Sequence, residues 1–426
     1  MFINEDFIIF LWNYQVFDKT KLKTTTGEQI TIIKIGSPNN DSGADFFNSK
    51  IQIGETIWAG NIEIHVNSSD WYSHKHNIDK SYNNVILHVV YNHDKDVIID
   101  NRTLPVIELK NRINASLISK YYVFKSSPKN IPCQNEINTI PSIYITKWLE
   151  TLSIERLEEK TNQILQSLQS KNYDFEEVFY QKIAYGFGLK INSEMMEILA
   201  NSIPLKNLNK QSYNLLQIEA ILFGQAGFLN EIEPTNQYIL KLKEEYKFLQ
   251  NKYNLTPFDK KIWKYSKLRP TSFPEIKIAL LAKLIFQNQN LFSAFTEEKN
   301  IENIKNKLAI IEVSEYWKTD FRIEKQTIST NKHLGENTIN IIIINVIIPF
   351  IFAYGKTKNE IKYIDKAIEF LNNIKAEQNN IIEKFNKIGI KSNNAADSQA
   401  IIQLFNKYCK NKQCLKCSIG QHLLKE

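Results

Sequence analysis

The spacing of hydrophobic residues changes in character near residue 130. Before this point, short segments either alternate between apolar and polar residues or are apolar throughout, which is typical of strands. After it, apolar residues recur every three or four positions, as they do on one face of a helix. We therefore expect an α+β protein, with an α/β domain over residues 1–130 and a larger all-helical domain over residues 131–426.

The N-terminal pattern predicts a helix, three strands, a second helix and a fourth strand, followed by one extra strand. Gly54 and Glu55 separate two of the strands, which are therefore expected to form a hairpin. The segment 116–133 has no clear period and is expected to be irregular. The expected helices cover residues 3–17 and 68–82, and the expected strands cover residues 28–36, 45–54, 56–66, 84–91 and 105–110.

The longest apolar run, residues 341–354, is interrupted by Asn345 and Pro349. It is shorter than the roughly 20 residues that a helix needs to span a bilayer, so we expect a buried core helix. The N-terminal segment carries acidic residues and has no basic region before its apolar residues, so it does not resemble a secretion signal. A soluble, cytoplasmic protein without membrane contact is expected.

Composition adds little about partners. The chain of 426 residues has a net charge of +7, which agrees with a nucleic-acid partner. Lysine, asparagine and isoleucine are abundant throughout, however, so the positive charge does not mark one segment. Glycine-rich loops of the phosphate-binding or dinucleotide-binding type are absent from the sequence.

Acidic residues and histidines gather in the expected hairpin. Residues two apart in a strand face the same side, so Glu63 and His65 are expected to share one face, with Ile62, Ile64 and Val66 toward the core. Asp45 begins the preceding strand, close enough across the ladder for its carboxylate to meet that of Glu63. Two adjacent carboxylates raise each other's pKa, and a divalent cation removes this penalty. The pair predicts bound Mg²⁺ or Mn²⁺, which could activate water for attack on a phosphodiester.

This order of elements, with Asp45 on the second strand and Glu63 on the third, resembles the PD-(D/E)xK nuclease superfamily over roughly residues 3–91. The resemblance implies a catalytic metal ion held by Asp45 and Glu63. It also implies that Glu5 corresponds to an acid found on the first helix of some members.

His65 stands where the superfamily has a lysine that positions the attacking water and the phosphate. A neutral imidazole could accept a proton or bind metal, but it is not a permanent cation. The superfamily tolerates a lysine that has moved to the following helix, so Lys75 or Lys80 could take that place.

A second placement of the same motif stays open. Glu108 and Lys110 supply the letters Glu-x-Lys within the segment IELK, and Asp94 or Asp96 could be the upstream acid. The irregular sequence expected after this segment gives the second placement less weight than the first.

The other histidines have ordinary explanations. His88 lies within an apolar strand and is expected to be a core residue, and His93 is expected in a turn. Asp70 and His74 are four residues apart and would share a helical face, so they could form a zinc site with His65. No H-x-x-x-H or H-E-x-x-H spacing supports such a site.

Cysteines form a second constellation near the C-terminus. Cys409, Cys414 and Cys417 have the spacing C-x4-C-x2-C, and Cys133 is the only other cysteine. In a cytoplasmic protein such thiols are more often metal ligands than disulfides. We expect a structural zinc ion or an iron–sulfur cluster, with Cys133 as the fourth ligand and His422 as the alternative.

The full chain also resembles a bacterial family called domain of unknown function 2851, through segments such as LWNYQVFD, NVILHVVY, LRPTSFPEIKIA and CLKCSIG. That name implies no activity. The function expected from the residues is a metal-dependent nuclease acting on DNA or RNA. The alternatives are a nucleic-acid-binding module without catalysis and a helical scaffold that binds a protein.

Overall fold

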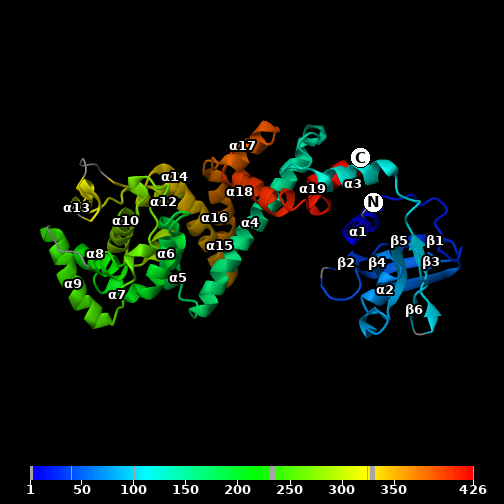
Figure 1. The fold of residues 1–426 in the computed structure, drawn as a ribbon, viewed down its shortest axis with the longest axis horizontal. Helices are drawn as coiled ribbons and strands as arrows, with labels where there is room; N and C mark the ends of the chain where they lie inside the picture. The colour runs from blue at the N-terminus through cyan, green and yellow to red at the C-terminus, as the bar shows by residue number, and fades with distance from the viewer. Residues whose placement is uncertain are drawn as a thin grey trace. The chain divides into compact units, whose positions relative to one another are not determined.

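A computed structural model describes residues 3–39, 41–99, 101–230, 236–323, 325–326 and 332–425 (Figure 1). The fold is mixed α+β, with a sheet in the N-terminal part and helices in most of the rest. Contacts divide the chain into two compact units. One unit joins Met1–Trp148 with Leu404–Glu426, and the other is Leu149–Gln403. The sequence had predicted one division near residue 130, with the C-terminus in the helical domain.

The sheet of the first unit has the strand order β1–β3–β4–β5–β8, and the short β2 also pairs with β3. The pairs β1–β3 and β3–β4 are antiparallel, whereas β4–β5 and β5–β8 are parallel. A small separate hairpin of β6 and β7 follows β5. The strands are β1 (Ile30–Lys34), β2 (Ser37–Pro38), β3 (Phe46–Ile53), β4 (Thr56–Asn67), β5 (Val85–Asn92), β6 (Ile98–Ile99), β7 (Arg102–Thr103) and β8 (Val106–Glu108).

The helix α1 (Glu5–Tyr14) packs its apolar side against β4 and β5. It begins after Asn4, whose side chain accepts a hydrogen bond from the Phe7 amide at 3.3 Å. Phe7 and Trp12 are fully buried, and Trp12 Nε1 donates to the Ile35 carbonyl at 3.2 Å. These contacts hold the first turn of α1, which carries Glu5, close to the sheet.

The first helix and the strands expected from the sequence are confirmed to within a few residues, but the second helix is much shorter than expected. In place of a helix over residues 68–82 there is one turn, α2 (Asp70–Ser73), and a separate 3₁₀ turn at Lys80–Tyr82. Lys75 has a φ of 62°, a left-handed conformation through which a right-handed helix cannot continue.

The expectation of irregular structure over residues 116–133 is wrong, because α3 (Ala115–Ser126) occupies most of it. The Asn114 side chain caps this helix by accepting from the Ser116 amide at 2.9 Å. The helix buries Leu117, Ile118, Tyr121 and Phe124. The C-terminal segment of the first unit contains a π-helical stretch at Leu404–Cys409 and α19 (Ser418–Lys425), and α19 contacts α3.

The second unit is built of helices around one large apolar core. The helix α4 (Ser142–Ser170) begins in the first unit and leads into the second. A two-stranded sheet, β9 (Asp320–Arg322) and β10 (Lys325–Gln326), was not expected. The other helices are α5 (Phe175–Phe187), α6 (Ser193–Ser202), α7 (Leu205–Asn209), α8 (Leu215–Gln225), α9 (Gln237–Tyr253), α10 (Pro274–Gln287), α11 (Leu291–Thr296), α12 (Ile301–Ala309), α13 (Glu315–Thr319), α14 (Glu336–Ile342), α15 (Ile348–Lys358), α16 (Ile361–Asn373), α17 (Asn380–Lys387) and α18 (Ala395–Gln403).

The long apolar run lies in one continuous helical segment, Glu336–Lys358, made of α14, a π-helical stretch at Ile343–Ile347 and α15. At 23 residues this segment is longer than the apolar run seen in the sequence. It is the only helix in the described ranges that is long and apolar enough to cross a membrane. Because 72% of its most apolar window is buried inside the protein, it has the burial of a core helix, as the sequence predicted.

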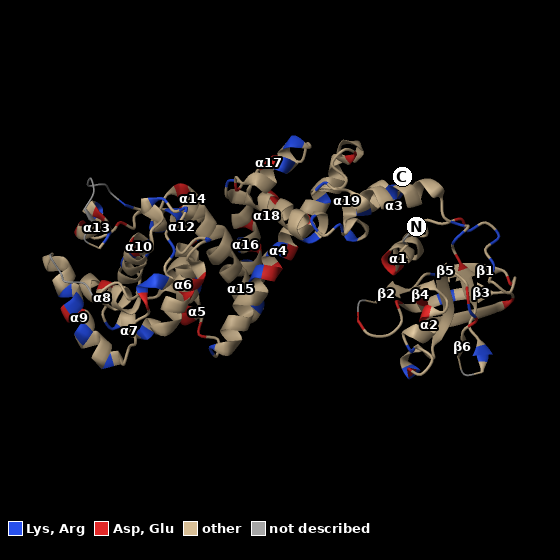
Figure 2. Ribbon diagram, in the orientation of Figure 1, with Lys and Arg blue, Asp and Glu red and all other residues tan. Residues whose placement is uncertain are grey.

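Charged residues of both signs are interspersed along the helices of the second unit (Figure 2). On α9, for example, lysines and glutamates follow one another within a few positions.

Candidate metal site on the sheet

Asp45 and Glu63 lie side by side on neighbouring segments of the sheet: the Glu63 carboxylate accepts from the Asp45 amide, and the Asp45 carboxylate accepts from the amide of Ile64, next to Glu63. Asp45 immediately precedes β3, and Glu63 lies in β4. The Asp45 amide donates to Glu63 Oε2 at 3.2 Å, and the Ile64 amide donates to Asp45 Oδ2 at 2.9 Å. This reciprocal arrangement brings the two carboxylates together, at the point of the sheet where the sequence predicted that they would meet.

Three carboxylates share this position. Burial, and to a smaller extent the charge of Glu5, raise the pKa of Glu63 to about 8. Burial and the charge of Glu63 raise the pKa of Asp45 to about 7. Burial and the charge of Asp45 likewise raise the pKa of Glu5, in the first turn of α1, to about 7. Carboxylates that raise one another's pKa are suited to binding a divalent cation, because the positive charge of the cation lowers their pKa again.

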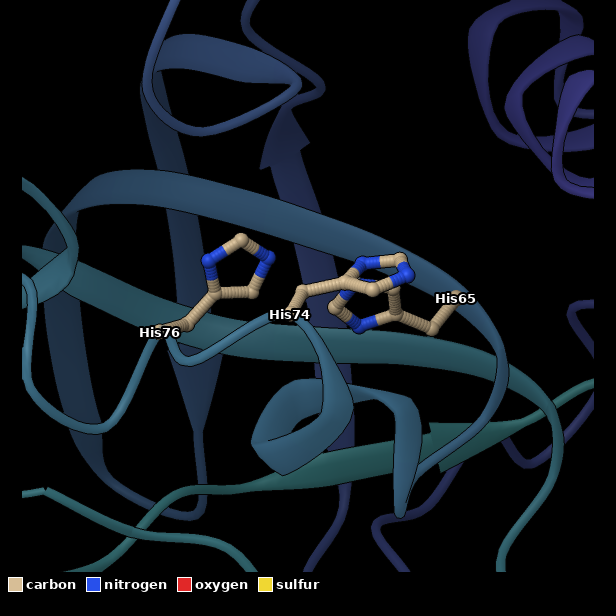
Figure 3. A group of neighbouring side chains, drawn as sticks. All are labelled: His65, His74 and His76. Carbon is tan, nitrogen blue, oxygen red and sulfur yellow. The ribbon is translucent and has the colours of Figure 1, made fainter.

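Three histidines form a group close to Glu63, and Figure 3 shows how their rings lie. His65 extends from β4, whereas His74 and His76 belong to the turn that follows α2. One nitrogen of each ring lies within 4.8 Å of the other two, and no other group of three His, Cys, Asp or Glu side chains in the described ranges meets this criterion. His76 Nε2 is 3.2 Å and His65 Nε2 is 3.5 Å from Glu63 Oε1. Nitrogen and oxygen donors therefore converge on one point.

His65 is the centre of a chain of imidazoles. Its Nδ1 is 2.8 Å from His88 Nε2, and its Nε2 is 3.0 Å from His74 Nδ1. Burial and the neighbouring rings lower the pKa of His65 to about 2, and burial with His76 lowers that of His88 to about 3. Both rings are neutral at physiological pH, and neutral imidazole is the form that binds metal or accepts a proton.

The backbone at the base of the turn holds the histidines in place. Asp70 Oδ2 accepts a hydrogen bond from the Asn67 amide at 2.9 Å, which fixes the chain where β4 ends and α2 begins. Trp71, on α2, is fully buried. Its ring lies edge-on to three imidazoles, those of His65, His76 and His88. One short helical turn therefore positions several rings of the site.

A cavity of about 820 Å³ borders the carboxylates. Glu5, Asp45, Asn92 and Lys110 are among the residues that line it. Lys110 follows β8, and because β4, β5 and β8 run parallel, their C-terminal ends meet at this edge of the sheet. Lys110 Nζ donates to Asn92 Oδ1 at 3.2 Å. An anionic group in this cavity would meet both the carboxylate site and a lysine.

The two lysines expected to replace the motif lysine do not reach this cavity. Lys75 and Lys80 are exposed, and neither lines it. Val66 also differs from expectation, since it is only half-buried and lines the cavity instead of the core. The basic residue that the structure places beside the site is Lys110.

The second placement of the nuclease motif does not assemble a site. Glu108 Oε1 accepts from the His93 amide at 3.1 Å, and Asp96 lies 3.2 Å from His93 Nε2. Asp94 accepts hydrogen bonds from the amide and hydroxyl of Ser69 at 2.9 and 2.7 Å. These acids bond to turns, and among the residues of this placement only Lys110 lines the cavity.

Sequence reasoning missed two histidines of the site. The sequence allowed a zinc set of His65, His74 and Asp70 without supporting it, whereas the histidines that the structure groups are His65, His74 and His76, because α2 ends before His76 and the chain turns back. His88 is buried as expected, but it also bonds to His65. The parallel pairing of β4 and β5 places His88 opposite Glu63, and this register is a property of the assembled sheet, not of the sequence.

The four cysteines predicted as ligands, Cys133, Cys409, Cys414 and Cys417, all belong to the first unit. All four are buried and none forms a disulfide.

A family model described as protein of unknown function (DUF2851) matches residues 5–380. The chain belongs to this family. The match to DUF2851 includes every carboxylate and histidine of the site, but it ends before Cys409, although the segment CLKCSIG had contributed to the resemblance. No curated protein and no solved structure matches the chain. The DUF2851 description assigns no activity, so the function must be argued from the site itself.

Proposed function

We propose that this DUF2851 protein is a metal-dependent nuclease that hydrolyses phosphodiester bonds in DNA or RNA. One observation carries the proposal: Glu5, Asp45 and Glu63 gather where burial and then their mutual charges raise their pKa values, beside a cavity that Glu5, Asp45 and Lys110 line. Such carboxylates are suited to a divalent ion, and the cavity is suited to a phosphate group next to it.

The order and direction of the strands support the proposal. The helix α1 packs on a sheet in which β1, β3 and β4 are antiparallel and β5 joins β4 in parallel. This arrangement resembles the core expected of PD-(D/E)xK nucleases, in which acids on the second and third strands hold the metal. By that resemblance Asp45 and Glu63 are the metal ligands, and Glu5 is the acid from the first helix.

The residues around the carboxylates would have separate roles. When bound, the ion would polarise the phosphate and lower the pKa of a water molecule. Lys110 would hold the phosphate by its charge, which neutral His65 cannot do. Both ring nitrogens of His65 are hydrogen-bonded, to His88 and to His74, and its pKa is lowered to about 2. Glu5, which lines the cavity and whose pKa is raised to about 7, would therefore accept the proton of the water.

The mixture of donors bears on the choice of metal. Carboxylates alone suit Mg²⁺, whereas imidazoles favour transition metals. His65 and His76 both lie within 3.5 Å of a Glu63 oxygen, so nitrogen donors are close to the ion. We therefore expect Mn²⁺ to bind more tightly than Mg²⁺ and to support faster cleavage.

Cleavage of single-stranded and double-stranded DNA and RNA with Mn²⁺ tests the proposal. We expect Asp45→Asn and Glu63→Gln to lower the rate by about 100-fold or more, because each removes a metal ligand. Asp96→Asn, an exposed acid from the other placement of the motif, is the matched control and should keep full activity. Equal rates for all three variants would contradict the proposal.

A nucleic-acid-binding module without cleavage is the second candidate, because neutral His65 replaces the motif lysine. It predicts binding that weakens steeply with salt, without any product. Absence of both binding and cleavage would favour the third candidate, a helical scaffold for a protein partner.

A further inference from the structure

The histidines His65, His74 and His76 form a group of nitrogen donors that the cavity does not explain. One nitrogen of each ring lies within 4.8 Å of the other two (Figure 3). None of the three is among the described residues that line the cavity beside Glu5 and Asp45. The group therefore needs a role other than contact with a substrate in that cavity.

The donor atoms have the spacing of ligands around one small ion. His65 Nε2 is 3.0 Å from His74 Nδ1 and 3.5 Å from Glu63 Oε1, and His76 Nε2 is 3.2 Å from the same oxygen. Zinc binds such donors at about 2.0–2.2 Å, so the neighbouring ligands of a tetrahedral ion are about 3.3 Å apart. The contact between His65 and His74 is a hydrogen bond when one ring supplies the proton, and an ion would take the place of that proton.

His76 has a buried nitrogen that the surrounding side chains leave without a hydrogen bond. Its side chain is only 10% exposed, and its Nε2 makes no hydrogen bond with any described residue, although Glu63 Oε1 is close by. The ring stacks on Tyr82 with centroids 3.8 Å apart and lies edge-on to Trp71, so it cannot easily turn away. A cation beside Glu63 would bind the lone pair of this nitrogen and remove the cost of burying it unpaired.

His88 supports the form of His65 that binds metal. His65 Nδ1 is 2.8 Å from His88 Nε2, and the two residues are 1% and 0% exposed. When a metal binds His65 through Nε2, the ring proton stays on Nδ1 and is donated to His88. Histidine ligands usually donate their second nitrogen to a partner of this kind, which fixes the orientation of the ring. This gives a polar residue in the apolar strand β5 a reason to be there.

The mixture of donors selects the class of ion. Three imidazoles with one carboxylate favour zinc over Mg²⁺, which prefers oxygen ligands. Glu63 can serve this ion and the carboxylate site together, because its Oε1 lies near His65 and His76 while its Oε2 accepts from the Asp45 amide. Four protein donors fill a tetrahedral shell and leave no position for water, as in structural zinc sites.

We propose that His65, His74, His76 and Glu63 bind one structural zinc ion, separate from the Mn²⁺ of the proposed nuclease site. The ion ties the turn after α2 to β4, which carries His65 and Glu63. The helix α2 has only four residues, too few to hold that turn by itself. By fixing Glu63, the zinc ion also positions one carboxylate of the nuclease site, but zinc binding does not depend on cleavage.

Zinc binding to the full chain tests the proposal, measured by calorimetry with Zn²⁺ alone and by elemental analysis after dialysis. Because buried cysteines could also hold zinc, the readout is the difference between variants. We expect His74→Ala and His76→Ala each to bind one zinc ion fewer per chain than the wild type. His93→Ala is the matched control, a histidine of the same unit outside the group, and should bind as much zinc as the wild type. Co²⁺ in the wild-type chain should show the strong visible absorption of tetrahedral coordination, and His74→Ala should weaken it.

Equal zinc content in the wild type, His74→Ala and His76→Ala would overturn the proposal. A zinc ion that Asp45→Asn removes and His74→Ala keeps would also overturn it, because that ion would lie among the carboxylates. We expect Asp45→Asn to keep its zinc while it loses cleavage with Mn²⁺, so this proposal and the nuclease proposal fail separately. Because His74 is exposed, His74→Ala leaves the buried packing of the sheet intact.

Discussion

Glu63 keeps a proton that an ordinary glutamate would lose. Its pKa in the folded protein is raised from 4.5 to about 8, by burial first and then by Glu5. Between these two values the unfolded chain binds fewer protons than the folded one, so stability without metal falls as pH rises through this window. Asp45, raised to about 7, acts in the same direction. A bound cation would offset this cost, which is what a metal site implies.

Glu63→Gln should therefore stabilise the metal-free protein. The variant removes the charge and keeps an oxygen that can accept from the Asp45 amide. We expect it to be more stable than the wild type by about 1–3 kcal/mol at pH 8 and to match it near pH 4, below the unfolded pKa of about 4.5. Urea unfolding at both pH values measures the difference, with Asp96→Asn as a control that shows no such gain. A variant less stable at both values would make Glu63 a structural residue.

Lys110→Met tests the lysine of the cavity. Lys110 lines the cavity but is not one of the carboxylates, so its loss should slow cleavage about 10- to 1,000-fold and leave Mn²⁺ affinity unchanged. Cleavage rates and calorimetric Mn²⁺ titration give the two readouts. Lys80→Met, an exposed lysine outside the cavity, should change neither. Equal rates for both variants would show that Lys110 takes no part in catalysis.

At the scale of single residues, the part of the site that follows from strand geometry was predictable. Asp45 and Glu63 meet because adjacent strands place them together, and alternation along a strand is visible in the sequence. The position of His76 depends on the left-handed backbone conformation of Lys75, and no pattern in the sequence predicts that turn. The location of Lys110 beside the site depends on parallel strands whose ends meet at one edge, and this is a property of the assembled sheet.

Among the elements, β4 shows why the strands were easier to predict than the helices of the first unit. Its residues alternate between polar and apolar from Asn61 to Asn67, which is long enough to indicate a strand. In contrast, α2 has only four residues, and α3 mixes polar and apolar side chains around its axis. Short or weakly amphipathic helices depend on tertiary packing, which the local sequence does not contain.

Gly60 sets the distance between β4 and the start of β5. A Cβ atom there would lie 2.5 Å from Ile86 Cγ2 and 2.6 Å from the Asn84 carbonyl oxygen. We expect Gly60→Ala to destabilise the protein by about 1–3 kcal/mol and to weaken Mn²⁺ binding, because β4 carries Glu63 and His65. Gly335→Ala, with open space around it, should cost under about 1 kcal/mol and leave Mn²⁺ binding intact. Wild-type Mn²⁺ affinity in Gly60→Ala would show that the site tolerates movement of β4.

For the whole molecule, the division into two units was only partly visible in the sequence. The change of pattern near residue 130 marks where strands end, whereas the contacts divide the chain after Trp148. The return of Leu404–Glu426 to the first unit depends on contacts between segments far apart in the sequence, such as that of α19 with α3. Helical period alone cannot assign a segment to one unit or the other.

Each unit has its own apolar core, so a metal ion bound to one should stabilise that one alone. At a Mn²⁺ concentration 100 times the dissociation constant, binding adds about 2.7 kcal/mol, or roughly 5–10 °C in the melting temperature of the unit that carries the sheet. Scanning calorimetry of the full chain at pH 8 should show one transition that moves with Mn²⁺ and one that does not. Asp45→Asn should abolish the movement. A shift of both transitions, or a shift that survives in Asp45→Asn, would place the bound metal outside the carboxylate site.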